Sequence, residues 1–381
     1  MFVYADNAST TPINPDALNC IVSAYTRYYG NPSSTHKCGK EAWVALQNAR
    51  TNIAKALGVH GDEIIFTSGG TESNNIVLQS YLKKNNASKI IISSIEHKSV
   101  LECVKYCSKK PDDIMTLPVD REGVVLTSHL HDNLSCRDVS LVSIMTVNNE
   151  IGTVQPISDI AKLCHEHGVL LHTDAVQAVT LSSIREIINC ADYISLSGHK
   201  FHGPKGVGLL IAKNNTTLDP IFYGGGQERG LRPGTENTVA AIGIAYAICD
   251  SVEHMYDSEK HLRILNQITI EGLLKIEGAK INGIRADRIP NIISVSFDGV
   301  DGVALVQLLS NEGIMVSTGS ACNSSNNNPS HVLSAIGLPE RESMGTIRIS
   351  YSRYNTEQEA RYLIEKVIDC VSYIRKITPC P

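Results

Sequence analysis

Lys200 stands in a turn whose residue types are suited to covalent chemistry. Residues 197–206 are bordered by glycines and directly follow residues 193–196, which have the apolar pattern of a buried strand. A lysine held at a strand end can present its amine to a carbonyl compound and form a Schiff base. For Lys200 taken alone, the alternative is a solvated basic loop.

Asp174 and the turn at residues 67–74 lie at the ends of two more predicted strands. Open α/β sheets place their ligands at this edge, and a buried carboxylate there needs a partner such as a protonated pyridine nitrogen. The alternative is that Asp174 caps a following helix, with Gln177 on the same face of its first turn. The glycine-containing turn offers backbone N–H groups and the Thr71 hydroxyl to a phosphate, or is a plain capping turn.

Together, these features favour one cofactor. A lysine, an aspartate and a phosphate-binding turn at strand ends of one sheet are jointly explained by pyridoxal 5'-phosphate. No metal is expected, because Cys103 and Cys107 lie four residues apart on a predicted helix without a second pair of ligands.

Cys322 differs from the other ten cysteines in its predicted surroundings. Residues 318–330 are rich in serine, asparagine and glycine and lack apolar periodicity, so they predict an exposed, mobile loop. The other cysteines fall in predicted helices or strands or near the chain ends, where a free thiol is usually inert and buried. Cys322 is therefore the candidate nucleophile, and an incidental surface cysteine is the alternative.

Three further side chains are candidates for the same site. His97 follows the predicted strand at residues 89–92 and could stack on a flat cofactor or transfer protons, or be a surface histidine. Arg348 could bind a substrate carboxylate, or form a structural salt bridge. Asn149 could donate to a ring substituent, although turn chemistry explains it equally well.

The elements that position these residues predict an α/β fold. Near-continuous apolar runs alternate with helix-like segments and indicate a doubly wound, mainly parallel sheet within a large domain, residues 14–250. Residues 1–13 and 251–381 predict a smaller α+β domain that carries the Cys322 loop. The large-domain strands are expected at residues 63–67, 89–92, 141–145, 169–172, 193–196 and 207–211.

Composition excludes several classes of protein. The 381 residues carry 34 Lys and Arg against 39 Asp and Glu, a formal charge of −5, which argues against direct nucleic-acid binding. No run approaches the roughly 18 apolar residues of a membrane span. Eleven scattered cysteines without a leader-like segment predict a cytoplasmic chain without a disulfide framework.

The chain resembles the group I (NifS/IscS-like) cysteine desulfurases, which belong to the fold type I pyridoxal-phosphate-dependent transferases. The resemblance runs nearly from end to end. Its motifs are residues 6–12, 30–34, 67–74, 96–98, 147–152, 174–177, 197–206 and 232–237.

The resemblance implies a role for each matching residue. Lys200 would bind the cofactor covalently, Asp174 would pair with the pyridine nitrogen and His97 would stack on the ring. Arg348, with Asn31, would bind the α-carboxylate of cysteine, and Cys322 would accept its sulfur. The other cofactor contacts would be Gly70, Thr71, Asn149, Gln177, Ser197, His199 and, from the neighbouring subunit of a homodimer, Thr235.

The implied activity converts L-cysteine to L-alanine, leaving a persulfide on Cys322 that passes to an acceptor protein. The chain stops at Pro381, without the longer carboxyl-terminal extension by which housekeeping members dock an iron–sulfur scaffold. A dedicated pathway such as DNA phosphorothioation or tRNA thiolation is therefore a hypothesis. The alternatives are another pyridoxal-phosphate-dependent carbon–sulfur lyase or aminotransferase, or a non-catalytic sulfur-transfer scaffold.

Overall fold

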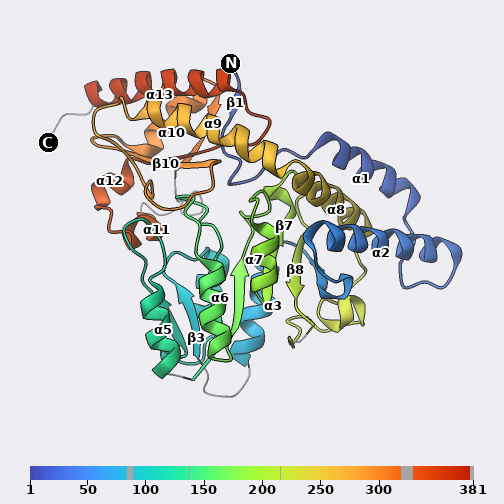
Figure 1. Ribbon diagram of the computed structural model, residues 1–381. Helices are drawn as coiled ribbons and strands as arrows, with labels where there is room; N and C mark the ends of the chain where they lie inside the picture. The colour runs from blue at the N-terminus through green and yellow to red at the C-terminus, as the bar shows by residue number, and fades with distance from the viewer. Residues whose placement is uncertain (84–88, 137, 215, 319–328, 378–381) are drawn as a thin grey trace.

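The structure is a computed structural model that describes residues 1–381 except 84–88, 137, 215, 319–328 and 378–381. A seven-stranded sheet forms the centre of its larger part (Figure 1). β8 runs antiparallel to both of its neighbours, and the other four pairs of strands are parallel. The prediction of a mainly parallel sheet is therefore confirmed. In sheet order the strands are β2 (Ile64–Thr67), β8 (Gly208–Ala212), β7 (Tyr193–Ser197), β6 (Leu170–Asp174), β5 (Val139–Ser143), β3 (Lys89–Ser93) and β4 (Ile114–Leu117).

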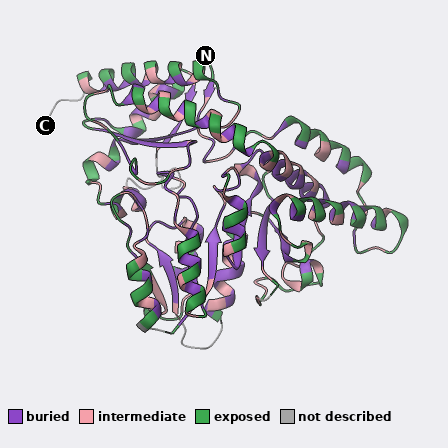
Figure 2. Cartoon of the chain, in the orientation of Figure 1, coloured by how far each residue is buried: buried purple, intermediate pink, exposed green. Residues whose placement is uncertain are grey.

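Helices cover both faces of this sheet, so its inner strands are buried (Figure 2). Successive strand residues point to opposite faces, and Ile64 and Ile65 accordingly belong to two different apolar cores. One core includes α2 (Lys37–Leu57), α5 (Thr127–Cys136), α6 (Ile157–Glu166), α7 (Ile184–Cys190) and α8 (Thr238–Glu253), and α1 (Pro15–Arg27) packs on α8. The other includes α3 (Gly70–Lys83) and α4 (Lys98–Cys107).

The smaller part is built on an antiparallel sheet in the order β12-β13-β10-β9. Helices α9, α10 and α13 bury their apolar sides against it in a separate core. A short parallel pair, β1 (Val3–Tyr4) with β11 (Ile314–Met315), ties the N-terminal segment to this part. The remaining bounds are β9 (Ala279–Ile281), β10 (Ile292–Phe297), β12 (Ser317–Thr318), β13 (Thr346–Ser350), α9 (Met255–Leu273), α10 (Gly302–Asn311), α11 (His331–Ala335), α12 (Glu340–Met344) and α13 (Glu357–Ile377).

Two details of the expected strands were wrong. The strand predicted at residues 141–145 is β5 (Val139–Ser143), and β4 was not predicted. β4 is short and half-exposed at the edge of the sheet, so it lacks the apolar run that marks the inner strands. The domain boundaries stay a prediction, although Val332 and Leu333 of α11 lie in the core of the large sheet.

Candidate active site

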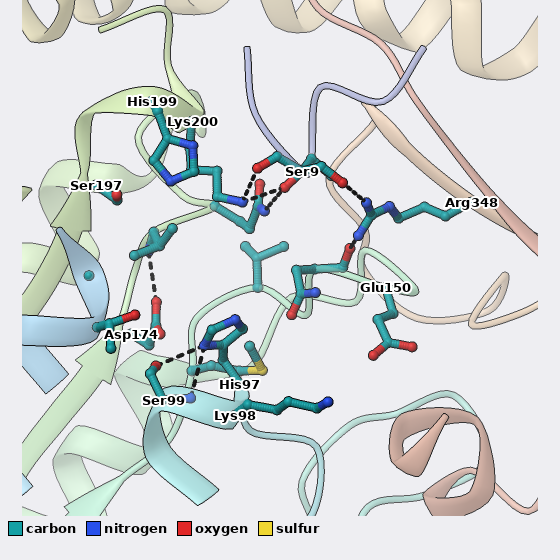
Figure 3. A pocket seen from close by; sticks show the side chains of 18 of the residues that line it. Ser9, His97, Lys98, Ser99, Glu150, Asp174, Ser197, His199, Lys200 and Arg348 are labelled. Atoms are coloured by element: carbon teal, nitrogen blue, oxygen red, sulfur yellow. Dashed lines mark hydrogen bonds between the residues drawn. The ribbon is translucent and has the colours of Figure 1, made fainter. Parts of the chain in front are cut away.

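A cavity of about 320 Å³ lies at the carboxyl end of the large sheet, where β13 of the small sheet approaches it. Figure 3 shows the side chains of its wall. The cavity brings together most of the residues predicted from the sequence: Gly70, Thr71, His97, Asn149, Asp174, Gln177, Ser197, His199, Lys200 and Arg348.

Lys200 reaches the cavity from a tight turn directly after β7. Its Nζ donates to the carbonyl oxygens of Ala8 and Ser9, each at 2.7 Å, so the N-terminal segment holds the amine in place. Close packing requires two of the glycines, because a Cβ on Gly203 would lie 2.8 Å from the carbonyl oxygen of Gly198, and a Cβ on Gly198 would lie 2.9 Å from that of Pro204. The sequence prediction that a glycine-bordered turn presents this lysine at a strand end is confirmed.

Asp174 ends β6, and its carboxylate is buried. Oδ2 accepts a 2.7 Å hydrogen bond from Nδ2 of Asn74, and Oδ1 accepts one of 3.0 Å from the backbone of Val176. The alternative of a helix cap was wrong, because residues 176–180 form a turn and α7 begins only at Ile184. Gln177 therefore lies on this turn, and its Nε2 donates to the Ala8 carbonyl at 2.9 Å.

The N-terminus of α3 and the end of β7 form a polar corner beside Lys200. Gly70 begins α3 next to Val176, and a Cβ at Gly70 would lie 2.6 Å from Val176 Cγ2. His199 shares a 3.1 Å hydrogen bond with the Thr10 hydroxyl. Burial, helped by the charges of Lys200 and Lys205, lowers the His199 pKa to about 4, so the imidazole is neutral at pH 7. This corner can donate hydrogen bonds to an anion from backbone and side chain.

His97 caps the N-terminus of α4. Its Nδ1 accepts a 3.1 Å hydrogen bond from the backbone N–H of Ser99, so in the neutral ring the proton sits on Nε2. Burial lowers the pKa of His97, and Lys200 lowers it further, although Asp174 acts in the opposite direction. The ring is therefore a neutral N–H donor in the cavity.

Arg348 enters the cavity from β13 and is almost fully buried. Its Nη2 donates to Asp6 Oδ1 at 2.9 Å and to the Ser9 hydroxyl at 2.6 Å, and Nη1 donates to the Asn149 carbonyl at 2.8 Å. Lys200 and Arg348 thus meet Ser9 from opposite sides (Figure 3). The salt-bridge interpretation of this arginine is confirmed, and binding of a substrate carboxylate stays a prediction for a side chain that lines the cavity.

Three predicted residues are not placed in this cavity. Asn31 and Thr235 are exposed and lie outside it. The Asn31 carboxamide instead accepts a 2.9 Å bond from the backbone of Ser33, as in an ordinary turn. Cys322 lies outside the described residues.

Several residues of the site were missed from the sequence. Ser9, Asn74 and Glu150 belong to the motifs that carry the resemblance, so a signal for them was present. Lys98 and His331 also line the cavity, and His331 falls in none of those motifs.

The other described cysteine side chains differ in part from expectation. Cys103, Cys164 and Cys370 are buried, while those of Cys20, Cys38, Cys107, Cys190 and Cys249 are half-buried. Across the described residues, no cluster of three or more histidine, cysteine or acidic side chains could bind a metal ion. In the same part of the chain, no helix combines the length and the apolar character that crossing a bilayer requires.

Comparison with known proteins places the chain in a family. The model of the class-V aminotransferases matches residues 3–363. A cysteine desulfurase IscS from Methanosarcina thermophila is 40% identical over 99% of this chain and 94% of the relative. A solved NifS-like protein superposes with a TM-score of 0.89 at 40% identity, covering 98% of this chain and all of the other. A solved structure described as SspA in complex with cysteine gives a TM-score of 0.80 at 34% identity, over 93% and 100% of the two chains.

The fold and the matched length define a pyridoxal-phosphate-dependent enzyme of fold type I, and the chain belongs to the class-V aminotransferase family. Within that family it is a member of the IscS/NifS-like cysteine desulfurases.

Proposed function

We propose that this enzyme binds pyridoxal 5'-phosphate, converts L-cysteine to L-alanine and carries the released sulfur as a persulfide on Cys322. The observation that supports this most directly is the meeting of Lys200, Asp174 and Arg348 in one cavity. These residues supply an amine, a buried carboxylate and a guanidinium, the three groups that amino-acid chemistry on this cofactor requires.

The donor set of the cavity fits the cofactor. A phosphate would lie in the corner formed by Gly70, Thr71, Ser197 and His199, where the missing side chain of Gly70 lets the N-terminus of α3 approach Val176. At the other end, the buried carboxylate of Asp174 would hold a proton on the pyridine nitrogen. His97 would cover the ring, and Asn149 and Gln177 would contact its substituents. The bound cofactor supplies an electron sink for negative charge on the substrate's α-carbon.

The chain's own residues perform the remaining steps. Lys200 would bind the cofactor through Nζ and, once displaced by substrate, accept the α-proton at that same atom. Arg348, oriented by Asp6 and the Asn149 carbonyl, would bind the α-carboxylate. Asn31 would assist it from a neighbouring subunit.

The sulfur step balances without an added oxidant. The Cys322 thiolate attacks the substrate's sulfur, an S–S bond forms and the C–S bond breaks, with its electron pair passing to the carbon fragment. That fragment takes up a proton and leaves as alanine. The sum is one thiol plus L-cysteine giving one persulfide plus L-alanine.

The proposal is tested by comparing wild type with Cys322→Ser in alanine and sulfide release from L-cysteine with a reductant. We expect the variant to lose at least about 100-fold in rate, because serine cannot form a persulfide. Cys190→Ser is the matched control, since this half-buried cysteine on α7 lies outside the cavity and should leave the rate unchanged. Full activity in Cys322→Ser would instead indicate direct carbon–sulfur cleavage, and a wild type that leaves cysteine untouched would refute the desulfurase.

The acceptor is tested with the same persulfide. Sulfur-35 from labelled cysteine, once on the enzyme, is offered to purified acceptors from DNA phosphorothioation, tRNA thiolation and iron–sulfur assembly. Transfer to either of the first two supports the dedicated-pathway hypothesis, whereas transfer only to the iron–sulfur scaffold contradicts it.

A further inference from the structure

His331 is a second histidine in the cavity, and the mechanism above assigns it no role. It begins α11, is half-buried and lines the same cavity as His97 and Lys98. Its Nε2 lies 3.0 Å from the carbonyl oxygen of Glu96, which can only accept, so Nε2 carries the proton and donates it. Nδ1 is then an unprotonated acceptor, and it has no hydrogen-bond partner among the residues that the structure describes.

The two histidines of the cavity therefore present opposite tautomers. His97 accepts at Nδ1 from the Ser99 backbone and keeps its proton on Nε2. His331 keeps its proton on Nε2 for the Glu96 carbonyl and leaves the lone pair of Nδ1 available. One ring can donate a proton and the other can accept one.

Burial, together with the neighbouring positive charges, lowers the pKa of His331 and keeps its ring neutral. Burial lowers the His331 pKa, and the nearby Lys98 and His97 lower it further, although the bond to Glu96 acts in the opposite direction. Burial raises the Glu96 pKa to about 8, so this carboxyl is uncharged at neutral pH and does not stabilise an imidazolium. Glu150, on the loop facing α11, has its pKa raised by burial to about 7.

The position of His331 is fixed by the residues that flank it. The Ser330 hydroxyl donates a 2.5 Å hydrogen bond to Glu150 Oε2 and accepts from the backbone N–H groups of Val332 and Leu333. Val332 and Leu333 are buried in the core of the large sheet. The imidazole is thus attached to a short helix that is anchored on both sides of it, as an acid–base group requires.

We propose that His331 is the general base of sulfur transfer: its Nδ1 accepts the proton that the substrate's sulfur releases as that sulfur joins Cys322. This inference rests on the proposed function. The S–H bond breaks with its electron pair staying on sulfur, an N–H bond forms at Nδ1, and the imidazolium then returns the proton to solvent.

The strength of the base suits this step. An ordinary thiol has a pKa of about 8.5, so a histidine with a lowered pKa is too weak to ionise it efficiently. A persulfide is a stronger acid than a thiol, and its proton passes readily to a neutral imidazole. The basicity of His331 is accordingly suited to deprotonating the persulfide that sulfur transfer produces, and not the free thiol of the substrate.

The test uses the cofactor-loaded enzyme and two reactions. His331→Gln keeps an amide N–H for the Glu96 carbonyl but cannot take up a proton. We expect desulfuration of L-cysteine to slow about 100-fold and to lose the acid limb of its pH profile. Exchange of the α-hydrogen of L-alanine with deuterated water should stay within about twofold of wild type, since it involves no thiol proton. His129→Gln, on the exposed surface of α5, is the matched control and should change neither reaction.

Each outcome decides the proposal. An equal loss in both reactions would make His331 structural, and an unchanged rate and pH profile with cysteine would show that another group accepts the proton. His331→Ala supplies an independent measurement, because added imidazole should restore desulfuration if a proton acceptor is missing and should not if the fold is damaged. A wild type that exchanges alanine but releases no sulfide would refute the proposed function instead.

Discussion

The charge of the Glu96 carboxyl group is determined by its burial in the protein interior. It is completely buried, and its Oε1 accepts bonds from the Ser93 hydroxyl at 2.5 Å and the Met145 backbone at 2.9 Å. Its Oε2 is buried with no partner among the described residues. Burial outweighs the two hydrogen bonds and raises the Glu96 pKa to about 8, so the group is protonated at pH 7.

We predict that Glu96→Gln flattens the dependence of stability on pH. The folded-state pKa of Glu96 lies above its ordinary value, so the folded protein binds the extra proton between about pH 4.5 and 8. The stability that this group contributes is therefore complete below that range and is lost as pH rises through it, by at most about 1.4 kcal/mol per pH unit. Glutamine cannot ionise, so the variant should gain in Tm relative to wild type between pH 5 and 8.

Thermal unfolding at pH 5, 6.5 and 8 measures this difference. Glu102→Gln, exposed on α4, is the control and should run parallel to wild type. Parallel curves for Glu96→Gln as well would show that Glu96 is ionised throughout.

Among the elements, the junction of β2 and α3 requires a glycine at position 70, where there is no space for a side chain. Gly70 begins α3, and a Cβ there would lie 2.6 Å from Val176 Cγ2, well inside contact distance. Val176 stands in the turn after Asp174 and also lines the cavity. Glycine therefore allows α3 and this turn to approach each other closely around the space assigned to the phosphate.

Gly70→Ala is expected to weaken cofactor binding about tenfold or more while the fold is retained. The added methyl group must displace Val176, and overpacking of this kind costs roughly 1–3 kcal/mol. Titration of the cofactor-free protein with pyridoxal 5'-phosphate, followed by absorbance, gives the dissociation constant. Gly61→Ala is the control, because its Cβ would meet only Arg50 carbons at 3.8 Å. Equal affinities for Gly70→Ala and wild type would place the phosphate elsewhere.

The local sequence pattern predicted the type of an element better than it predicted the residues at which that element begins and ends. The strand predicted at residues 193–196 is β7 (Tyr193–Ser197), and the strand predicted at residues 89–92 is β3 (Lys89–Ser93). The turn at residues 176–180 stands where the alternative for Asp174 placed a helix, and Ala175, Ala178 and Val179 are buried in the core there. Backbone bonds from Ala178 to Ala175 and from Leu181 to Ala178 close short turns there.

At the scale of the whole molecule, the cavity and the exposed residues together suggest a second subunit. Asn31 and Thr235 match site motifs of the family but are exposed outside the cavity of their own chain. Helices α1 and α2 lie at one side of the molecule (Figure 1), and apolar side chains are exposed along them. These are Leu18, Val22, Tyr25, Trp43 and Val44. We propose that this side contacts another copy, whose site receives Asn31 and Thr235.

Mixed dimers of Lys200→Ala and Thr235→Ala chains test this arrangement. If Thr235 acts across the interface, one of the two sites in the mixed dimer contains both native residues, and activity should recover to about half that of wild type. Dimers of either single variant should remain impaired. If Thr235 acts within its own chain, the mixed dimer has no intact site, and no recovery should be seen when the two tagged chains are refolded together.

The element types, the mainly parallel sheet and the strand-end turns that carry Lys200, Asp174 and Gly70 could be predicted from the amino-acid sequence. These follow from local patterns, because apolar periodicity and glycine placement act over a few residues. The contacts between distant groups could not be predicted and follow from the fold: the Ala8 and Ser9 carbonyls accept from Lys200, and the Glu96 carbonyl accepts from His331. The tertiary structure also decided the charge of Glu96, because burial is produced by packing segments far apart in the chain and leaves no local signal.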